Sequence, residues 1–236
     1  MVKDKVIIVT GASQGLGKEL SLQLSKLGAK LALIARSEKL LKELTTELSK
    51  HSESEYFVCD VSNINQVQAT IKKVVEKFGR IDMLINGAGI WTTDEFEELR
   101  PELIEQAFKV NSIGPIYLTK AVLPILKKQN SGHIFNVVSK AGLDIPDNKD
   151  WPTYAATKWA MTGYTQALKY HLQDTKIKVT GFFPAGFESN IFETLGEKDA
   201  HKQPWMMRTA DVASAIIYAL NSPDDLWINS IGMSNI

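Results

Sequence analysis

Seven short, mainly apolar runs recur along the chain, separated by stretches with helical periodicity. The runs cover residues 5–11, 30–36, 55–61, 81–87, 132–139, 176–184 and 226–233. The first, KVIIVTG, is a β-branched run that stops at a glycine, which is typical of a strand buried in a parallel sheet. Because strands and helices alternate throughout, the expected fold is a doubly wound α/β sheet of about seven parallel strands, with helices on both faces.

Apolar residues at helical spacing fill several of the intervals between the runs. The stripes are Leu20, Leu24 and Leu27; Leu40, Leu44 and Leu48; Val67, Ile71, Val74 and Phe78; and Val212, Ile216 and Leu220. Gly28 and Gly79 are expected to end two of these helices, because glycine adopts the left-handed conformation of a helix C-terminus at little cost. Ser37 is a predicted N-cap for the helix after the second strand.

Two longer helices are predicted in the second half of the chain. One covers residues 101–128 and is expected to bend near Gly114–Pro115, and the other covers residues 152–173. Residues 185–207 lack a sustained period and are expected to form an irregular loop with short helical pieces. Because repeats, low-complexity tracts and linkers are absent from the sequence, residues 1–236 are interpreted as one domain.

The composition excludes some classes of function. Lys and Arg number 27, and Asp and Glu also 27, so the 236-residue chain has a formal net charge of zero and no sign of a nucleic-acid or membrane-surface partner. Cys59 is the single cysteine, which rules out an internal disulfide and indicates a reducing compartment. Without a run of membrane length or a signal-peptide cleavage site, a soluble cytoplasmic protein is expected. The four histidines lack a ligand spacing, so no metal is expected.

A glycine-rich segment, TGASQGLG, follows the first predicted strand and begins the first predicted helix. Its glycines are Gly11, Gly15 and Gly17, a spacing that differs from the Gly-x-Gly-x-x-Gly dinucleotide fingerprint. The physics is shared, because glycines let the backbone turn tightly and approach a pyrophosphate at a helix N-terminus. The alternative is a glycine-rich turn without a ligand.

The segment TYAATK places Tyr154 and Lys158 four residues apart in a predicted helix, and therefore on one face of it. A free tyrosine has a pKa of about 10, and a cation one turn away favours the phenolate. We therefore expect Lys158 to lower the pKa of Tyr154, which would suit Tyr154 to act as a general acid or base. The alternative is an ordinary helix surface.

Together, TGASQGLG and YAATK resemble the single-domain branch of the short-chain dehydrogenase/reductase family over nearly the whole chain. The resemblance implies a Rossmann-like fold and hydride transfer between a nicotinamide cofactor and a carbonyl or secondary alcohol. It also implies a homodimer or homotetramer, with the helices at 101–128 and 152–173 in the interface. A small-molecule substrate is the expected partner.

The end of the second predicted strand bears on the choice of cofactor. Ala35 stands where NAD-binding members of the family carry an acidic residue, and Arg36 and Ser37 follow it. An arginine there can pair with the 2′-phosphate of NADP, so NADP(H) is favoured and NAD(H) is the alternative. Some relatives carry a second basic residue in the glycine loop, where this chain has Gln14.

The resemblance also assigns cofactor contacts along the chain. The expected contacts are Gly11, Ser13, Gln14, Gly15, Leu16, Gly17, Arg36, Ser37, Asp60, Val61, Asn86, Gly87, Ala88, Tyr154, Lys158, Pro184, Phe187 and Ser189. Asp60 is expected to bind the adenine amino group. The chain departs from the family pattern at Gly87, where a second asparagine is usual, at Ala185, where glycine is usual, and at Ser189, where threonine is common.

Four residues match the catalytic set of the family: Asn111, Ser139, Tyr154 and Lys158. By resemblance, Ser139 hydrogen-bonds the substrate oxygen, Lys158 also binds the nicotinamide ribose, and Asn111 holds a water that links the lysine to solvent. For Asn111 the alternative is a helix residue that is hydrogen-bonded locally. A non-catalytic dinucleotide sensor on the same fold is the competing function, but a sensor has no need of all four residues.

Several large apolar residues fall near the expected position of the nicotinamide. Candidate substrate contacts are Trp91, Ser139, Trp151, Phe187 and Trp205, with Phe192, Met206 and Met207 nearby. A pocket of this kind suits an apolar or aromatic carbonyl compound. The alternative is that several of these side chains cover the core or a subunit contact.

Overall fold

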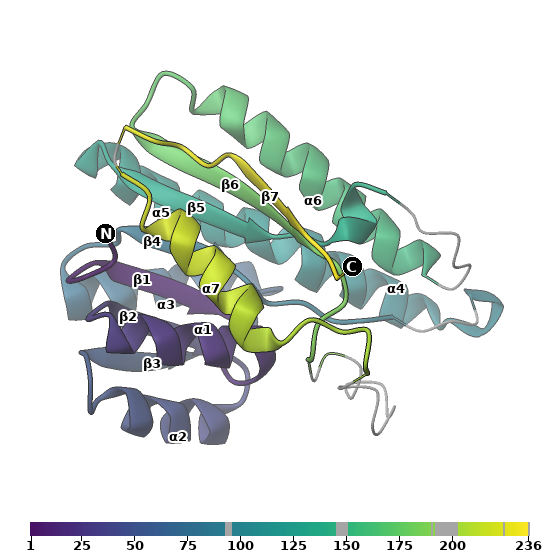
Figure 1. Ribbon diagram of the computed structural model, residues 1–236, viewed down its shortest axis with the longest axis horizontal. Coiled ribbons are helices and arrows are strands. Elements are labelled where there is room, and N and C mark those ends of the chain that lie inside the picture. Colours follow the sequence, from purple (N-terminus) through teal and green to yellow (C-terminus); the bar gives the residue numbers. More distant parts are fainter. Residues whose placement is uncertain (93–95, 145–150, 190, 192–202, 224, 236) are drawn as a thin grey trace.

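Seven parallel strands form a single sheet in the order β3-β2-β1-β4-β5-β6-β7 in the computed structural model (Figure 1). The strands are β1 (Val6–Thr10), β2 (Lys30–Ala35), β3 (Ser54–Val58), β4 (Met83–Asn86), β5 (Gly132–Val137), β6 (Ile177–Pro184) and β7 (Ser230–Met233). The structure describes residues 1–92, 96–144, 151–189, 191, 203–223 and 225–235. The strand order reverses between β1 and β4, and the sheet of about seven parallel strands that the sequence predicts is confirmed.

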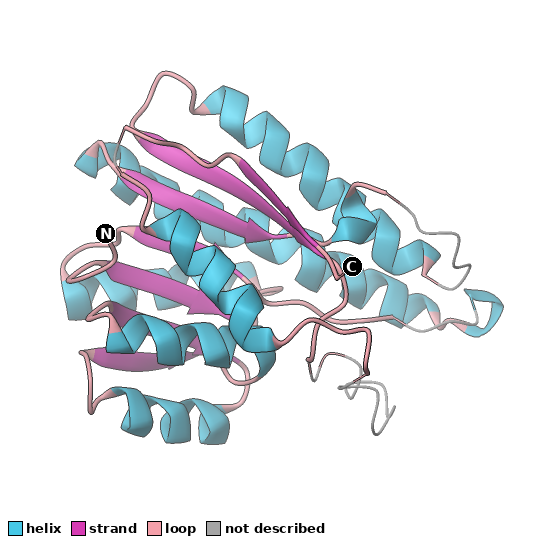
Figure 2. Cartoon of the chain, viewed as in Figure 1, coloured by secondary structure: helices cyan, strands magenta, loops and turns pink. Residues whose placement is uncertain are grey.

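Helices cover both faces of the sheet, as Figure 2 shows. The helices are α1 (Gly15–Lys26), α2 (Glu38–Leu48), α3 (Ile64–Phe78), α4 (Pro101–Phe108), α5 (Gly114–Gln129), α6 (Pro152–His171) and α7 (Thr209–Leu220). Shorter turns are η1 (Phe96–Glu98), the π-helical segment η2 (Lys109–Ile113) and η3 (Lys140–Gly142). One apolar cluster joins α1, α2 and α7 to the sheet, and a second joins α3, α5 and α6 to its other face.

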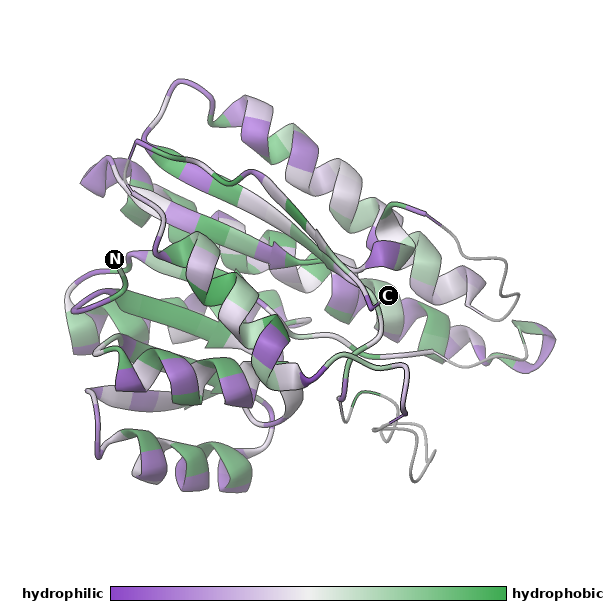
Figure 3. Ribbon diagram, in the orientation of Figure 1, coloured by the Kyte–Doolittle hydropathy of each residue, from purple (hydrophilic) through white to green (hydrophobic). Residues whose placement is uncertain are grey.

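Burial explains why these segments adopt these elements. All five residues of β1 are buried, and in Figure 3 this strand is apolar along its length. Helices such as α1 and α2 instead alternate apolar and polar bands in the same view, because only one face of each packs on the sheet. The doubly wound α/β fold therefore follows from the hydrophobic pattern.

The helix-ending residues behave largely as predicted. Gly79 is the C-cap of α3 with φ 75°, and Gly28 follows α1 with φ 79°, so both adopt the left-handed conformation. Ser37 occupies the N-cap position of α2, but its side chain makes no capping hydrogen bond. Its predicted position is confirmed, and the predicted capping bond is not.

The leucine stripe of α2 differs from the prediction by one residue. Leu41 is fully buried, whereas Leu40 is 38% exposed and lines the rim of a cavity. Leu27, at the end of α1, is also exposed. Both errors lie at helix ends, where an apolar side chain can point along the axis rather than at the sheet.

The helical stretch predicted over 101–128 is present, and its irregular part lies directly before Gly114–Pro115, near the predicted bend. The π segment η2 separates α4 from α5, and Asn111 is at its centre. Pro115 lies in the first turn of α5, directly after the π segment. A π segment carries one extra residue per turn, and such segments are frequent at functional sites.

The last strand is shorter than the predicted 226–233. Only Ser230–Met233 pairs with β6, while Trp227 is attached through its side chain, whose Nε1 donates to Val179 O at 3.0 Å. Beyond this pairing the chain returns to the loop after β6. Met233 O accepts from Ala185 N at 2.7 Å, and Asn235 Nδ2 donates to the carbonyl oxygen of Trp205. The C-terminal residues thus close one side of that loop.

All strands run in the same direction, so their carboxyl ends share one edge of the sheet. The loops that leave β1 to β6 gather at this edge, which is where α/β sheets hold ligands. In the described part of the chain, no helix is both long and apolar enough to cross a membrane.

Candidate active site

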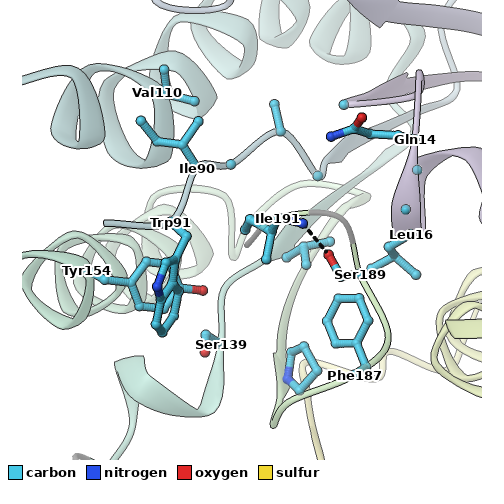
Figure 4. Close-up of a pocket in the computed structure, with 18 of the residues that line it drawn as sticks. Gln14, Leu16, Ile90, Trp91, Val110, Ser139, Tyr154, Phe187, Ser189 and Ile191 are labelled. Atoms are coloured by element: carbon cyan, nitrogen blue, oxygen red, sulfur yellow. Dashed lines mark hydrogen bonds between the residues drawn. The ribbon is translucent and has the colours of Figure 1, made fainter. Parts of the chain in front are cut away.

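A cavity of about 810 Å³ opens at the carboxyl edge of the sheet. Almost every predicted site residue lines it: Gly11, Ser13, Gln14, Gly15, Leu16, Gly17, Arg36, Ser37, Asp60, Val61, Gly87, Ala88, Trp91, Ser139, Trp151, Tyr154, Lys158, Pro184, Phe187, Ser189 and Trp205. Asn86 and Asn111 lie behind its wall. Figure 4 shows the glycine-loop residues Gln14 and Leu16 across the cavity from Tyr154 and Ser139.

The glycine loop is held by close backbone contacts. Gly11 and Gly15 have φ of 70° and 52°, which only glycine adopts readily. A Cβ at Gly17 would overlap the carbonyl oxygen of Gly11 and lie 2.7 Å from its carbonyl carbon. Helix α1 begins directly after this loop, and its N-cap Gln14 makes no side-chain capping bond. The backbone donors of the first turn are therefore not used by a cap, and they suit the pyrophosphate of a dinucleotide.

The rim of this half of the cavity carries Arg36 and Ser37, directly after β2. Arg36 is exposed and has no salt bridge with any described residue. Asp60 lines the cavity but also forms a local turn, because its Oδ1 accepts from the N–H and the hydroxyl of Ser62 at 2.9 and 2.7 Å. This geometry makes Asp60 a loop residue that holds its own turn, and it is also compatible with the expected contact to the adenine.

The sequence predicts Cys59 inside the third strand, but in the structure it lies directly after β3. Its N–H donates to Ala35 O at 2.9 Å, and its side chain is buried at the cavity wall. Burial raises the pKa of the thiol, with a smaller opposing effect from a hydrogen bond to Thr70. The thiol is therefore kept neutral, as expected for an unreactive cysteine.

Thr10 holds the turn after β4 and was not singled out from the sequence. Its Oγ1 donates to Ile85 O at 3.1 Å and accepts from the N–H groups of Gly87 and Ala88 at 3.0 and 3.2 Å. The only sequence signal was its position directly before Gly11. Asn86 points behind this turn, where its Nδ2 donates to Asn136 Oδ1 at 2.8 Å.

Tyr154, Lys158 and Ser139 meet at the other half of the cavity. The Lys158 Nζ lies 5.4 Å from the centre of the Tyr154 ring and 3.5 Å from Val137 O. Ser139 lies two residues after β5 as the N-cap of η3, and its Oγ accepts from Ala141 N at 3.2 Å. The Ser139 hydroxyl also hydrogen-bonds the phenol of Tyr154. The predicted neighbourhood of these three side chains is thus observed.

The expected lowering of the Tyr154 pKa is wrong for this structure. Burial raises the pKa of Tyr154 to about 12, and the hydrogen bond from Ser139 opposes this only in part. Burial also lowers the pKa of Lys158 to about 8, because an ammonium loses hydration in the interior. The sequence spacing revealed the neighbour but not the burial, and here burial dominates. Tyr154 is therefore protonated at neutral pH.

Asn111 lies in the π segment, and three hydrogen bonds to residues outside that segment fix its side chain. Its Oδ1 accepts from Ile90 N at 2.8 Å, and its Nδ2 donates to Ile90 O at 2.9 Å and to Thr157 Oγ1 at 3.2 Å. Both amide protons are used. Gly89 lies beside it, and a Cβ there would sit 3.4 Å from Asn111 Oδ1 and 4.0 Å from Lys158 Nζ. The room between the amide and the ammonium thus depends on residue 89 lacking a side chain.

An aromatic corner forms the wall beside Tyr154. We use this name for Trp91, Trp151 and Tyr154. The Trp91 ring lies 4.4 Å from that of Tyr154 and 4.9 Å from that of Trp151, the latter in an edge-to-face arrangement. Figure 4 shows the Trp91 and Tyr154 rings overlying each other, with Ser139 next to them. Sequence reasoning named all three residues but had no means of predicting that they touch.

The loop after β6 contributes the remaining wall. Its two described ends pair with each other, because Glu188 N donates to Met207 O at 2.9 Å and Met207 N to Gly186 O at 3.1 Å. Trp205 packs over Gly186, where a Cβ would overlap the indole, and is 57% exposed. Met206 lines the cavity, Met207 joins the core, and the candidate Phe192 lies outside the described residues.

Similarity to known proteins assigns the chain to a family. The family model described as short chain dehydrogenase matches residues 5–200. The chain belongs to the short-chain dehydrogenase family. An uncharacterized oxidoreductase of Staphylococcus epidermidis is 32% identical over 230 residues, which cover 98% of this chain and 96% of that protein.

Solved structures agree with the family assignment. An alcohol dehydrogenase from the archaeon Thermococcus sibiricus, complexed with 5-hydroxy-NADP, is 26% identical with a TM-score of 0.84, covering 98% of this chain and 97% of that one. A short-chain dehydrogenase/reductase from Burkholderia phymatum in complex with NAD is also 26% identical with a TM-score of 0.84, covering 93% and 86%. This short-chain dehydrogenase is therefore an NAD(P)-dependent oxidoreductase, which confirms the predicted enzyme class.

The cavity of this short-chain dehydrogenase fits a nicotinamide dinucleotide. At Gly17 the backbone packs so closely on Gly11 that a Cβ would overlap it. The start of α1, which has no side-chain cap, lies in the same loop, so its backbone N–H groups are available to the pyrophosphate. Gly87 keeps its backbone position through Thr10, so the departure from asparagine leaves the turn intact. In the loop after β6, the two residues that differ from the family pattern are Ala185 and Ser189. Ala185 N donates to Met233 O at 2.7 Å, and Ser189 Oγ accepts from Ile191 N at 3.1 Å, so both are held by hydrogen bonds to nearby residues of the structure.

Proposed function

We propose that the protein is an NADP(H)-dependent carbonyl reductase in which Tyr154 donates the proton to the substrate oxygen. The observation that carries the proposal is the meeting of Ser139, Tyr154 and Lys158 at one end of a cavity whose other end is the glycine loop. One ligand can thus reach both ends, as a reaction between cofactor and substrate requires.

Three side chains take part in the proton transfer to the substrate oxygen, while the nicotinamide, when bound, supplies the hydride to the carbonyl carbon. Ser139 orients the carbonyl oxygen through its hydroxyl, next to the phenol of Tyr154. Because burial raises its pKa to about 12, Tyr154 holds its proton at neutral pH and can donate it as negative charge develops on the oxygen. Lys158, 5.4 Å from the ring centre, stabilises the phenolate that remains.

These protonation states favour reduction over oxidation at neutral pH. A general base would have to be ionised before it could remove a proton, and burial opposes ionisation of Tyr154. Loss of the Lys158 proton would remove the charge that stabilises the phenolate. The rate of reduction should therefore fall as pH rises through about 8, the pKa of Lys158.

The preference for NADP(H) rests on the rim of the cavity. Arg36 and Ser37 follow β2 there, and Ala35 offers no carboxylate to the adenosine ribose. A guanidinium without a protein partner among the described residues is available for a 2′-phosphate. Similar structures have been solved with NADP and with NAD, so NAD(H) remains the alternative cofactor.

The substrate end favours an apolar or aromatic carbonyl compound, because Trp91 and Trp151 pack beside Tyr154 and Met206 also lines the cavity. We further propose that residues 1–236 act as one catalytic domain and assemble as a homodimer or homotetramer through α5 and α6. The outer face of α6 supports this assembly, since Trp159 and Tyr170 are 47% and 75% exposed on it.

Titration with NADPH and NADH, followed by a ketone and aldehyde screen, tests the proposal. Wild-type protein should bind NADPH and reduce at least one apolar ketone, whereas Tyr154→Phe should bind NADPH within about threefold of wild type and lose at least about 100-fold in kcat. Cofactor binding without turnover of any carbonyl or alcohol would favour the dinucleotide sensor. Equal kcat for wild type and Tyr154→Phe would refute the role of the phenol.

A further inference from the structure

Thr157 lies within the Tyr154–Lys158 turn, has no exposed surface and takes part in three hydrogen bonds that involve a side chain. Its Oγ1 donates to Tyr154 O at 2.7 Å and accepts from Asn111 Nδ2 at 3.2 Å. Its backbone oxygen accepts from Ser112 Oγ at 3.1 Å. Two side chains of the π segment η2, those of Asn111 and Ser112, therefore donate hydrogen bonds to this one residue of α6.

A helical threonine often bonds a carbonyl of the preceding turn, and such a bond alone has only local meaning. Thr162 and Thr165 in the same helix make bonds of this kind. Thr157 and Thr165 also each accept a hydrogen bond from an asparagine of another element, and Thr157 differs in that its asparagine belongs to the π segment, 46 positions earlier in the sequence. That residue, Asn111, holds both backbone polar groups of Ile90, which directly precedes Trp91 of the aromatic corner.

We propose that Thr157 is a positioning residue that fixes the spacing between the π segment η2 and the Tyr154–Lys158 turn of α6. The hydroxyl connects Asn111 to the backbone carbonyl of Tyr154, so the two sides of the reacting centre share one buried oxygen atom. Without that oxygen, the second amide proton of Asn111 has no acceptor inside the protein, and a buried unpaired donor drives local rearrangement or water entry. The effect on turnover rests on the proposed function, but the effect on spacing does not.

Thr157→Val is the direct test, because valine keeps the shape and removes the hydroxyl. Thr157→Ser restores the hydroxyl and should recover wild-type behaviour. Thr165→Val is a matched control. Thr165 is also buried in α6, donates to Met161 O at 2.7 Å and accepts from Asn136 Nδ2 at 2.9 Å. Thr165→Val therefore removes the same two kinds of hydrogen bond as Thr157→Val, but at a position that does not contact Tyr154 through them. A general cost of removing a buried threonine should appear in both valine variants.

The first readout is the pKa of Lys158, followed by NMR of protein labelled with ¹³C at the lysine Cε and assigned with Lys158→Met. Burial alone holds this pKa at about 8, no charged side chain contributes, and Tyr154 is the titratable group that faces it. Thr157→Val should raise it by about one unit towards the ordinary value of about 10.4, because water reaches the ammonium. Thr157→Ser and Thr165→Val should leave it within about 0.3 unit.

The second readout is turnover on a ketone that wild type reduces. Thr157→Val should lose at least about tenfold in kcat, with its alkaline limb moved to higher pH and NADPH affinity changed less than about threefold. If both valine variants shift the Lys158 pKa and kcat equally, or neither does, the positioning role is overturned. If wild type lacks all turnover, the proposed function fails, while the NMR titration still decides the role of Thr157.

Discussion

The two ends of the cavity are built in opposite ways. At the glycine-loop end the wall is backbone, and side chains are excluded where Gly17 packs on Gly11. At the reacting end the wall is made of buried polar side chains, and burial shifts the pKa of Tyr154 and Lys158 away from their ordinary values. At the glycine-loop end, the same glycines allow the close backbone packing and the approach of a ligand. At the reacting end, the proposed chemistry needs the buried groups of Tyr154 and Lys158, and burying the Lys158 ammonium lowers the stability of the fold.

The largest effect is expected at the glycine-loop end. Gly17→Ala should reduce the free energy of unfolding by about 4 kcal/mol or more and abolish cofactor binding, because the new Cβ overlaps backbone that has no room to move. Thermal unfolding and NADPH titration measure both losses. Gly163→Ala is the control, since its Cβ meets open space within α6 and should stabilise the helix by up to about 1 kcal/mol. Equal behaviour of the two variants would contradict the close packing.

The opposite sign is expected at the reacting end. Lys158→Met should increase the free energy of unfolding at pH 7 by about 3 kcal/mol, because a pKa of about 8 instead of 10.5 measures the cost of burying the ammonium. Wild-type stability should rise as pH increases from about 8 to 10.5, where the native state has released the proton and the unfolded state has not, and the gain of the variant should shrink over that range. Denaturant unfolding at several pH values measures this difference. Lys140→Met, an exposed neighbour of Ser139, should stay within about 0.5 kcal/mol.

A smaller effect is expected for Arg36, the cationic side chain named at the glycine-loop end. Arg36→Ala should weaken NADPH binding by about 10- to 100-fold, because an ion pair with a phosphate is lost, and should leave NADH binding within about threefold. Fluorescence titration with both cofactors gives the two dissociation constants. Similar losses for both would assign Arg36 a general role and favour NAD(H) as the cofactor.

The smallest change sharpens the comparison at the reacting end. Gly89→Ala should fold normally, because its Cβ has ordinary contacts at 3.4 and 4.0 Å, but should displace solvent between Asn111 and Lys158. The pKa of Lys158 should then fall further below about 8, so the alkaline limb of kcat moves to lower pH by about half a unit. A pH profile identical to wild type would show that this space does not hydrate the ammonium.

The sequence predicted the glycine-loop end better than the reacting end, for a physical reason. The loop is a local structure in which the spacing of Gly11, Gly15 and Gly17 reflects the backbone geometry directly. Apolar runs likewise reveal buried strands, so the sheet was predicted with errors of a few residues at its ends. The last strand, which begins at Ser230 instead of residue 226, is the largest of these errors.

The reacting end depends on contacts between distant parts of the chain. Asn111 bonds Ile90, 21 residues earlier, and Thr157, 46 residues later, and these bonds accompany a π segment where only a bend in the helix was predicted. The spacing of Tyr154 and Lys158 predicted their approach but not how deeply the fold buries them. The sign of the Tyr154 pKa shift was therefore wrong, because desolvation is a property of the assembled fold.

The position of the chain ends decides how this protein can be handled. Val2 N donates to Asn221 Oδ1 at 2.9 Å near the start of β1, whereas Asn235 contacts Trp205 at the loop after β6 (Figure 1). A fusion partner or surface anchor attached after Asn235 would thus lie next to Trp205, which lines the cavity, whereas the same addition before Val2 would lie near Asn221, which does not. Immobilisation through the amino end should preserve kcat/KM, while attachment through the carboxyl end should lower it most for bulky ketones.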